Sequence, residues 1–327
     1  MRVVVCIPAR YESTRFPGKM LANRTGKYLI QHTYEQACRA GIPEEVIIAT
    51  DDRRILDAAQ AFGARCVLTS AAHQTGTDRI AEAMAPMQAD IVVNLQGDEP
   101  QIDPSHIDQI AQLLIDAEGC DMATLGAPFE DPDDIGNPNI VKLVTDQSGR
   151  ALYFSRSVLP YHRDTGGVGP VDLYLRHVGM YAYRKAFLQT ITELPQGVLE
   201  RAEKLEQLRV LEHGYDILVG RVTHIAEGID TPEQYDAFVD QHQAGRVLKG
   251  GHHENEKGHL GRRYRTRTVS HCGRLATILL GRPGQRRLDA GGDERRLWPG
   301  PGTIQPDRLH RRADHCAASG GVTARRL

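Results

Sequence analysis

The chain has 327 residues, of which 40% are hydrophobic, so it can bury one large core or two smaller ones. No apolar run approaches the roughly 20 residues that a membrane helix needs, and we expect no membrane-spanning segment. The N-terminus enters a strand-like run without the apolar region of a secretory signal, and the six cysteines are scattered without a C-x-x-C pair. We therefore expect a cytoplasmic protein with reduced thiols.

The net charge of −2 hides an uneven distribution. Residues 244–327 carry 18 of the 40 Lys and Arg but only 7 of the 42 Asp and Glu, together with 14 of the 32 Gly. This stretch shows little periodicity, which predicts a globular domain over residues 1–243 followed by a basic, low-order tail that is disordered. The alternative is a basic arm for nucleic acid; we do not expect nucleic-acid binding, because the tail lacks interleaved aromatic residues and a recognised motif.

Strand-like and helix-like runs alternate through the first 128 residues. The expected strands are 2–9, 46–50, 66–69, 89–93 and 121–127, and the expected helices cover 27–40, 55–62, 80–84 and 104–117. Short connections between alternating strands and helices imply right-handed crossovers and a parallel sheet covered on both faces.

A basic loop follows the first strand. It runs from Pro8 to Lys19 and places Arg10, Arg15 and Lys19 within a dozen residues. Such a loop can surround a polyphosphate, since Arg forks contact pairs of oxygens and Lys acts as a point charge. It is neither a Walker loop nor a dinucleotide fingerprint, and a solvated basic loop is an equal alternative.

Two further loops follow strands at the same edge of the predicted sheet. Gly76 and Thr77 precede a helix, where Thr77 is a plausible N-cap and Gly76 allows a ligand to approach the backbone, although this segment alone favours a purely structural cap. Asp98 and Glu99 leave the fourth strand. An Asp at this edge can hold Mg²⁺ against nucleotide phosphates, and an acidic turn is the alternative.

The pattern changes after Pro128. Residues 140–146 and 151–156 are strand-like runs joined by a turn, which predicts an antiparallel hairpin, and 174–183 adds another strand. Residues 199–213 predict one continuous amphipathic helix, followed by a strand at 217–219. The last helix is expected to start at Pro232, with Thr231 as its N-cap.

Eight segments carry a family resemblance over about residues 1–242. They are Pro8–Lys19, His73–Arg79, Gln96–Pro100, Asn137–Lys142, Ala151–Arg156, Arg176–Tyr183, Leu205–Arg209 and Gly228–Pro232. In this order they resemble the family of 3-deoxy-manno-octulosonate (Kdo) cytidylyltransferases, or CMP-Kdo synthetases. The family commonly has Pro where this chain has Met20 and Tyr28.

The resemblance implies an α/β fold of the nucleotide-diphospho-sugar transferase (glycosyltransferase-A-like) type, mostly a parallel Rossmann-like sheet with a small antiparallel subregion. Residues 1–128 would form the nucleotide-binding half, and residues 129–243 the half for sugar binding and dimerisation. The implied reaction transfers CMP from CTP to the anomeric hydroxyl of Kdo, giving CMP-Kdo and pyrophosphate for lipopolysaccharide biosynthesis. Mg²⁺ is the implied cofactor, and a cytoplasmic homodimer the implied state. The alternatives are a cytidylyltransferase for another acidic sugar and a catalytically silent nucleotide-binding regulator.

The resemblance also implies a role for each site residue. Lys19, Asp98 and Asp230 would form the catalytic group, with the two Asp as ligands of Mg²⁺. The residues expected around the nucleotide and its phosphates are Ala9, Arg10, Arg15, Lys19, Gln74 and Gly76. The residues expected on the Kdo side are Gln96, Arg156, His177, Tyr181, Glu206 and Gln207. Arg156 is the natural partner of the sugar carboxylate. The chemistry would be in-line displacement, without a covalent intermediate and without an assigned general base.

Overall fold

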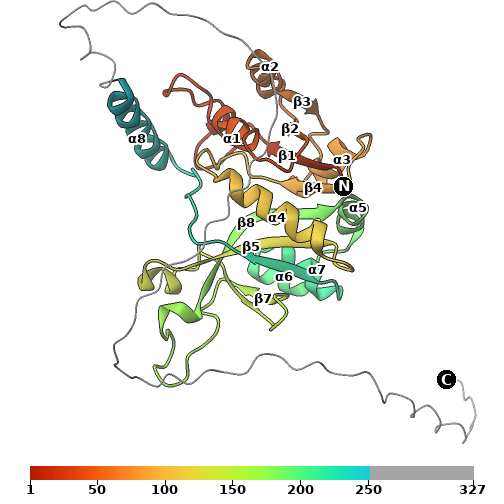
Figure 1. Cartoon of the computed structure of the whole chain (residues 1–327), viewed down its shortest axis with the longest axis vertical. Coiled ribbons are helices and arrows are strands. Elements are labelled where there is room, and N and C mark those ends of the chain that lie inside the picture. Colours follow the sequence, from red (N-terminus) through yellow and green to blue (C-terminus); the bar gives the residue numbers. More distant parts are fainter. Residues whose placement is uncertain (251–327) are drawn as a thin grey trace, which may run out of the picture. The chain divides into compact units, whose positions relative to one another are not determined.

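A computed structural model describes the backbone of residues 1–250 and the side chains of residues 1–244 (Figure 1). Within this range no helix combines the length and the apolar character needed to cross a membrane. The last described helix, α8 (Pro232–Gly250), continues past residue 243, where the predicted domain ends. The remainder of the predicted basic tail lies outside the described residues.

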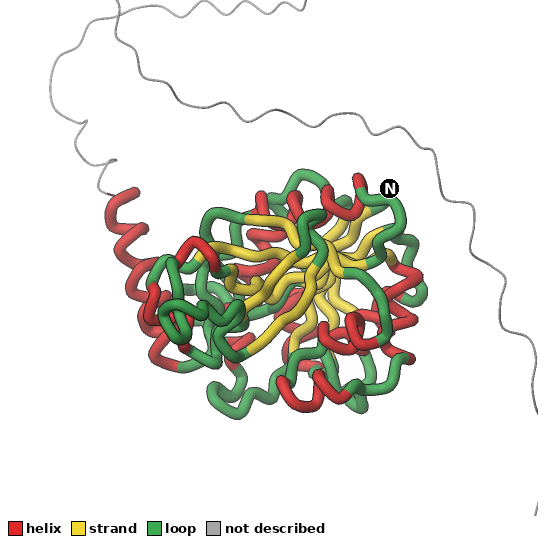
Figure 2. The backbone as a smooth tube through the Cα atoms, turned by 90° about the horizontal axis from the view of Figure 1, so that it is seen from below, coloured by secondary structure: helices red, strands yellow, loops and turns green. Residues whose placement is uncertain are grey.

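One sheet of nine strands runs through the described domain, with helices on both sides of it (Figure 2). Its main path has the order β3-β2-β1-β4-β8-β5-β9. The strands of this path are β1 (Val3–Ala9), β2 (Glu45–Thr50), β3 (Arg65–Leu68), β4 (Ile91–Asn94), β5 (Met122–Pro128), β8 (Leu175–Arg184) and β9 (Ile217–Arg221). β1 pairs in parallel with β2 and with β4, and β5 pairs in parallel with β9. The predicted mostly parallel α/β sheet is confirmed.

The strand β8 joins the two halves of the chain. It lies between β4 and β5 and runs antiparallel to both, so β5 is not the direct neighbour of β4. Tyr181 is opposite Asn94 in one pairing and opposite Thr124 in the other. A strand from the predicted sugar-binding half therefore stands beside the end of β4, the strand that leads to Asp98.

The two faces of the sheet bury separate cores. Val3, Val5 and Ile7 of β1 point into a core with helices α1 (Leu29–Ala37), α2 (Arg53–Ala61) and α4 (Pro104–Asp116). The alternate residues Val4 and Cys6 point into a second core with α3 (Gly76–Met84) and α5 (Lys185–Glu193). Side chains alternate along a strand, so a run that is apolar at every position is covered on both faces, as predicted.

The predicted hairpin is confirmed as β6 (Lys142–Thr145) and β7 (Ala151–Ser155), which pair antiparallel. Gly149 in the connecting turn has a φ of 82°, a left-handed conformation that glycine adopts without steric cost. β6 also pairs with β8, so the hairpin extends the sheet beside the strand that carries His177. Three short 3-10 helices complete the described elements: Lys19–Leu21, Pro132–Gly136 and Val171–Leu173.

The prediction of one helix over residues 199–213 is wrong. The segment forms two short helices, α6 (Val198–Glu203) and α7 (Gln207–Glu212), separated by Lys204, whose φ is 55°. Glu200 and Arg209 explain the break. In a continuous helix they would lie on opposite faces and about 13.5 Å apart along the axis. In the structure the Arg209 guanidinium donates to both carboxylate oxygens of Glu200 at 2.8 Å, and this buried pair requires the chain to turn between them.

One predicted helix cap is confirmed and one is wrong. Thr231 caps α8, since its Oγ1 accepts from the backbone N–H of Gln234 at 3.3 Å and the Gln234 side chain accepts from the Thr231 N–H at 3.1 Å. Helix α3, however, is capped by Thr75 and not by Thr77, because Thr75 and Asp78 form a reciprocal capping box. Thr77 is thereby free to turn its side chain into the molecule, where it is 4% exposed.

Candidate functional site

Two carboxylates from distant parts of the chain converge on one lysine. The Lys19 Nζ donates to Asp98 Oδ2 at 2.5 Å and to Asp230 Oδ1 at 3.0 Å. It also donates to the carbonyl oxygen of Ile229 at 3.1 Å, and an Arg15 guanidinium nitrogen lies 3.0 Å from Asp230 Oδ2. The structure thus brings together four of the predicted residues, including the pair of aspartates whose proximity the sequence could not supply.

The elements around this cluster explain its geometry. Asp98 follows β4 at the carboxyl edge of the sheet, and the backbone N–H of Ile229 donates to the Asp98 carbonyl oxygen at 2.8 Å. Gly97 is tightly enclosed, because an added Cβ would lie 2.8 Å from Ile30 Cδ1 and 3.3 Å from the carbonyl oxygen of Pro8. A larger residue at this turn would have to displace the Ile30 side chain, so glycine fits here, and the turn fixes where Asp98 points.

Burial and charge act in opposite directions at this cluster. Burial alone would lower the pKa of Lys19, but the Asp98 and Asp230 carboxylates raise it above its usual range. Burial would likewise raise the pKa of Asp230, but hydrogen bonds and charge from Lys19 and Arg15 lower it. For Glu99 both effects agree: burial and the neighbouring Asp98 charge raise its pKa to about 8. Lys19 and Asp230 therefore stay ionised at neutral pH, whereas the neutral form of Glu99 is favoured.

The donor set of this cluster fits the implied Mg²⁺. Asp98 Oδ2 and Asp230 Oδ1 both point at one position, which the Lys19 ammonium occupies, so the pair is already arranged around a positive charge. Carboxylate oxygens are the ligands that Mg²⁺ prefers. A divalent ion can take this position if the Lys19 side chain moves toward another anion.

A cavity of about 550 Å³ gathers all six residues predicted on the sugar side. These are Gln96, Arg156, His177, Tyr181, Glu206 and Gln207, and Gly76 from the predicted nucleotide side lines the same cavity. The insertion of β8 beside β4 brings His177 and Tyr181 to this place. The break between α6 and α7 supplies the opposite wall, since a continuous helix would not turn there.

Hydrogen bonds inside the cavity leave one donor unused. The Tyr181 hydroxyl donates to Gln207 Oε1 at 3.1 Å, whereas Gln207 Nε2 is buried and has no partner among the described residues. His177 Nε2 lies 2.9 Å from Thr124 Oγ1. The Arg156 guanidinium donates to the carbonyl oxygens of Glu203 and Pro138 at 2.7 and 3.0 Å. A buried amide without a partner is costly, which indicates that a ligand completes the set.

The ionisable groups of the cavity are shifted toward their neutral forms. Burial lowers the pKa of His177 to about 3 and raises the pKa of Tyr181 well above its usual range. Burial also raises the pKa of Glu206, although a hydrogen bond with Thr77 opposes the shift. The remaining charges that line the cavity include Arg156, so the cavity favours an anionic ligand.

The other predicted nucleotide residues are placed less centrally. Ala9 is the buried last residue of β1, and a Cβ added to Gly76 would lie 3.5 Å from the Pro8 side chain, so these backbones are close. Arg10 lines a different cavity of about 660 Å³, together with Asp51 and Asp52. Gln74 is exposed, and its amide donates to the carbonyl oxygen of Ala72 at 3.1 Å. Among the described residues, the partners of the Lys19 ammonium are Asp98, Ile229 and Asp230, and neither Arg10 nor Gln74 is one of them.

Sequence reasoning missed four polar residues that line the sugar-side cavity: Thr77, Asn94, Tyr183 and Lys204. Thr77 was assigned to a helix cap, and Lys204 was hidden inside the helix predicted over 199–213. Asn94, 2% exposed, ends an otherwise apolar buried strand, and a buried amide at a strand's carboxyl end was the signal that could have identified it.

Comparisons with known proteins show which family the chain is similar to. Residues 4–217 match a family model described as cytidylyltransferase. A protein of Syntrophobacter fumaroxidans named 3-deoxy-manno-octulosonate cytidylyltransferase is 50% identical over 242 residues, which cover 73% of this chain and 96% of the relative. One of Geobacter metallireducens with the same name is 49% identical over 250 residues, covering 74% and 98%. A solved structure of CMP:2-keto-3-deoxy-manno-octonic acid synthetase complexed with CTP is similar with a TM-score of 0.71 and 40% identity, covering 75% of this chain and all of that one.

Proposed function

The chain belongs to the cytidylyltransferase family that contains the 3-deoxy-manno-octulosonate cytidylyltransferases, and we propose that it transfers CMP from CTP to the anomeric hydroxyl of Kdo, releasing pyrophosphate. The observation that carries the proposal is the cavity of about 550 Å³ in which all six residues of the sugar side meet. The product of this reaction, CMP-Kdo, is the activated sugar for lipopolysaccharide biosynthesis.

The cationic loop after β1 binds the triphosphate of CTP. Arg15 and Lys19 already hold the Asp98–Asp230 pair, and both have donors suited to phosphate oxygens. Arg10, from the same loop, contacts the phosphates after it turns away from the cavity beside Asp51. Gly76 and the backbone at Ala9 lie close enough to form one wall of the nucleotide site.

The sugar-side cavity binds Kdo through charge and hydrogen bonds. Arg156 pairs with the sugar carboxylate. Burial raises the pKa of Glu206 and keeps His177 neutral, so little negative charge in the cavity competes for the Arg156 guanidinium. The unpartnered Gln207 Nε2 donates to a sugar hydroxyl, and the Tyr181 hydroxyl fixes the orientation of the Gln207 amide. Gln96 lines the cavity from the turn that leads to Asp98.

The reaction is an in-line displacement at the α-phosphorus of CTP. The anomeric oxygen of Kdo forms the new P–O bond while the bond to pyrophosphate breaks, and the proton of the anomeric hydroxyl passes to water. The protein contributes mainly by positioning two anionic substrates and by neutralising the charge that develops on phosphate oxygens. Mg²⁺, held by Asp98 and Asp230, would stabilise the charge on the triphosphate when bound. Lys19 then moves from the carboxylates to the phosphates.

We further propose that the protein acts as a homodimer in the cytoplasm. Leu152, Tyr161 and Leu173 of the second half have exposed fractions of 61%, 66% and 48%, and a partner could cover them. The cysteines of the described part are free thiols, as expected in a reducing compartment. Leu152→Arg should turn a dimer into a monomer in light scattering, while Val198→Arg, at an equally exposed position of α6, should not. A monomeric wild-type protein would contradict the dimer.

The test of the reaction is pyrophosphate release from CTP and Mg²⁺ by the full chain. We expect release with Kdo and much less with N-acetylneuraminate. A preference for N-acetylneuraminate would instead favour another acidic sugar as substrate. Silence with both sugars in a folded protein that still binds CTP would support a regulator.

A further inference from the structure

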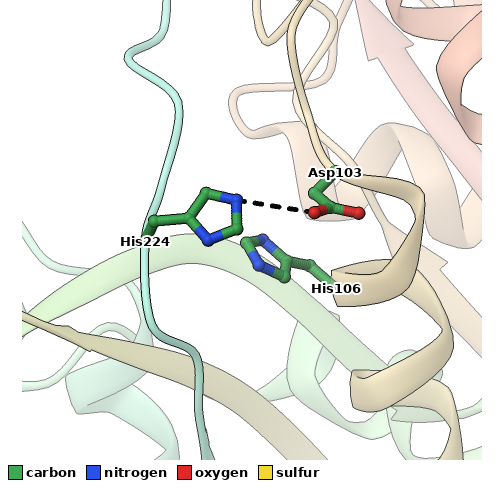
Figure 3. A group of neighbouring side chains, drawn as sticks. All are labelled: Asp103, His106 and His224. Atoms are coloured by element: carbon green, nitrogen blue, oxygen red, sulfur yellow. Dashed lines mark ion pairs between the residues drawn. The ribbon is translucent and has the colours of Figure 1, made fainter.

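Three side chains outside the proposed active site point toward one another: Asp103, His106 and His224 (Figure 3). Asp103 is the N-cap of α4, His106 lies in the first turn of that helix, and His224 lies in the segment after β9. Their potential ligand atoms all lie within 4.8 Å of one another. The cluster combines two imidazoles with one carboxylate.

Each of the three side chains has an atom left for a further partner. Asp103 Oδ1 accepts from the Ser105 N–H at 2.9 Å, and Oδ2 is 3.4 Å from His224 Nε2. His224 Nδ1 lies 3.3 Å from the Thr223 hydroxyl oxygen, which leaves Nε2 directed at the cluster. His106 is 3% exposed, and its Nδ1 has no partner among the described residues.

Hydrogen bonds to the backbone fix the segment that carries His224 close to helix α4, which carries His106. On one side the Gln109 amide of α4 donates to the carbonyl oxygen of Arg221 at 2.8 Å. On the other side the Ile229 N–H donates to the Asp98 carbonyl oxygen at 2.8 Å. His224 therefore faces α4 in a segment that is fixed at both ends, and only its side chain, 59% exposed, has to move to tighten the cluster.

We propose that Asp103, His106 and His224 form a binding site for a divalent transition-metal ion of the Zn²⁺ type, with water as a further ligand. Two imidazoles and a carboxylate are a donor set of such ions, whereas Mg²⁺ prefers oxygen ligands alone. The contact between His224 and the Thr223 hydroxyl would orient the imidazole, as partners of metal-bound histidines do. An ion pair between Asp103 and His224 is the simpler alternative, but it leaves the buried His106 Nδ1 without a partner.

The bound ion would tie two segments of the proposed active site together. Asp103 lies five positions after Asp98, and His224 lies six positions before Asp230. An ion between them would link the segment that carries one catalytic aspartate to the segment that carries the other. The site is thus a clamp on the geometry of the active site and does not contact the substrates.

The experiment compares Co²⁺ and Zn²⁺ binding by the full-length wild-type chain, His224→Gln, Asp103→Asn and the control His213→Gln, an exposed histidine outside the cluster. Asn is as good an N-cap as Asp, so Asp103→Asn leaves helix α4 capped. We expect wild type and His213→Gln to bind one more metal ion per chain than His224→Gln, with visible Co²⁺ absorption that His224→Gln lacks. Asp103→Asn should bind at least about tenfold more weakly.

A second readout is the thermal midpoint with and without Zn²⁺. An ion that binds only the folded chain raises the midpoint, and His224→Gln should lose this rise while His213→Gln keeps it. Wild type and His224→Gln share all other histidines and the Asp98–Asp230 pair. A difference between them in metal binding or thermal midpoint can therefore be assigned to the cluster. Equal metal uptake and equal Co²⁺ spectra in wild type and His224→Gln would overturn the proposal, and the cluster would then be an ion pair beside a buried histidine.

Discussion

Around Lys19 each charge faces an opposite charge, whereas in the cavity around Gln207 burial favours the neutral forms and leaves a donor unused. Lys19 and Arg15 neutralise Asp230, and Lys19 also binds Asp98. In the cavity, His177 is neutral and Gln207 Nε2 has no partner among the described residues. A ligand that binds around Lys19 must replace an existing ionic contact with a new one. A ligand that binds in the cavity around Gln207 adds a hydrogen bond to the unused Gln207 donor.

This difference separates the expected roles of the two regions. Contacts that have to be exchanged can strengthen as the reaction proceeds, and such contacts change the rate of the chemical step. Contacts that are made once, when the sugar enters, contribute equally to substrate and transition state and chiefly set KM. Substitutions in the two regions should therefore change different quantities.

The largest effect is expected from the ion pair that forms the cavity wall. Burial opposes the charged form of Glu200, but hydrogen bonds from Arg209 and Gln196 lower its pKa, so it stays ionised. Arg209→Met removes the partner and leaves a buried carboxylate, which should cost about 3–5 kcal/mol of the free energy of unfolding. Urea unfolding measures the loss. Arg201→Met, at an exposed position of α6, is the control, and equal stability of the two variants would show that the pair does not hold the wall.

Asp98→Asn tests the ionic region. Asn can still accept a hydrogen bond from Lys19, so the fold should persist, but one carboxylate charge is lost from the pair proposed to hold Mg²⁺. We expect kcat for pyrophosphate release to fall by about 10²- to 10³-fold, as for the loss of one electrostatic contact with the transition state. Asp236→Asn, an exposed partner of Arg24, is the matched control. A rate within about twofold of wild type would remove Asp98 from the catalytic group.

Gln207→Leu tests the neutral region. The change removes both the unused donor and the acceptor of the Tyr181 hydroxyl, with little change in volume. KM for Kdo should rise about tenfold, which corresponds to about 1.4 kcal/mol, while KM for CTP and kcat change little. Gln189→Leu, on the exposed face of α5, should leave all three constants unchanged. A fall in kcat with an unchanged KM for Kdo would contradict the separation between the two regions.

Local patterns were sufficient to predict most of the fold. The alternation of strand-like and helix-like runs predicted a parallel sheet covered on both faces, and the turn around Gly149 predicted the hairpin. Both follow from the alternation of side chains along strands and from turn chemistry, which depend on neighbours in sequence. The insertion of β8 between β4 and β5 depends on packing between distant segments, and no local pattern encodes it.

The candidate site divides in the same way. The position of Asp98 at the sheet edge could be predicted, because it follows a strand directly. The convergence of Asp230 on Lys19 is a tertiary contact, so before the structure it rested on the family resemblance alone. The break at Lys204 was missed because helix periodicity in 199–213 is strong, and the buried pair between Glu200 and Arg209 overrides it. The cluster of His106 and His224 was missed because, like the contact between Asp230 and Lys19, it joins residues that lie far apart in sequence.

The effect that is smallest at neutral pH, and most specific to the neutral region, is the dependence of stability on pH through His177. Its pKa is about 3 in the folded chain, because removal of the ring from water disfavours the charged form, against an ordinary value of 6.5. Between pH 6.5 and 3, His177 is therefore protonated in the unfolded chain but not in the folded chain. The stability contributed by neutral His177 is fully present above pH 6.5 and is lost as pH falls from there toward 3.

One pH unit below 6.5, this linkage should amount to about 1.4 kcal/mol, and it vanishes at neutral pH. His177→Gln has no proton to bind, and its side chain can still reach Thr124, so the free energy of unfolding should fall less steeply with acid than in the wild type. The difference between the two proteins cancels the carboxylates that both share, and His213→Gln, at an exposed histidine, should follow the wild type. Parallel acid profiles for wild type and His177→Gln would mean that His177 is protonated as easily in the folded chain as in the unfolded one. The cavity would then be open to water, and it could not keep its ionisable groups neutral before the sugar binds.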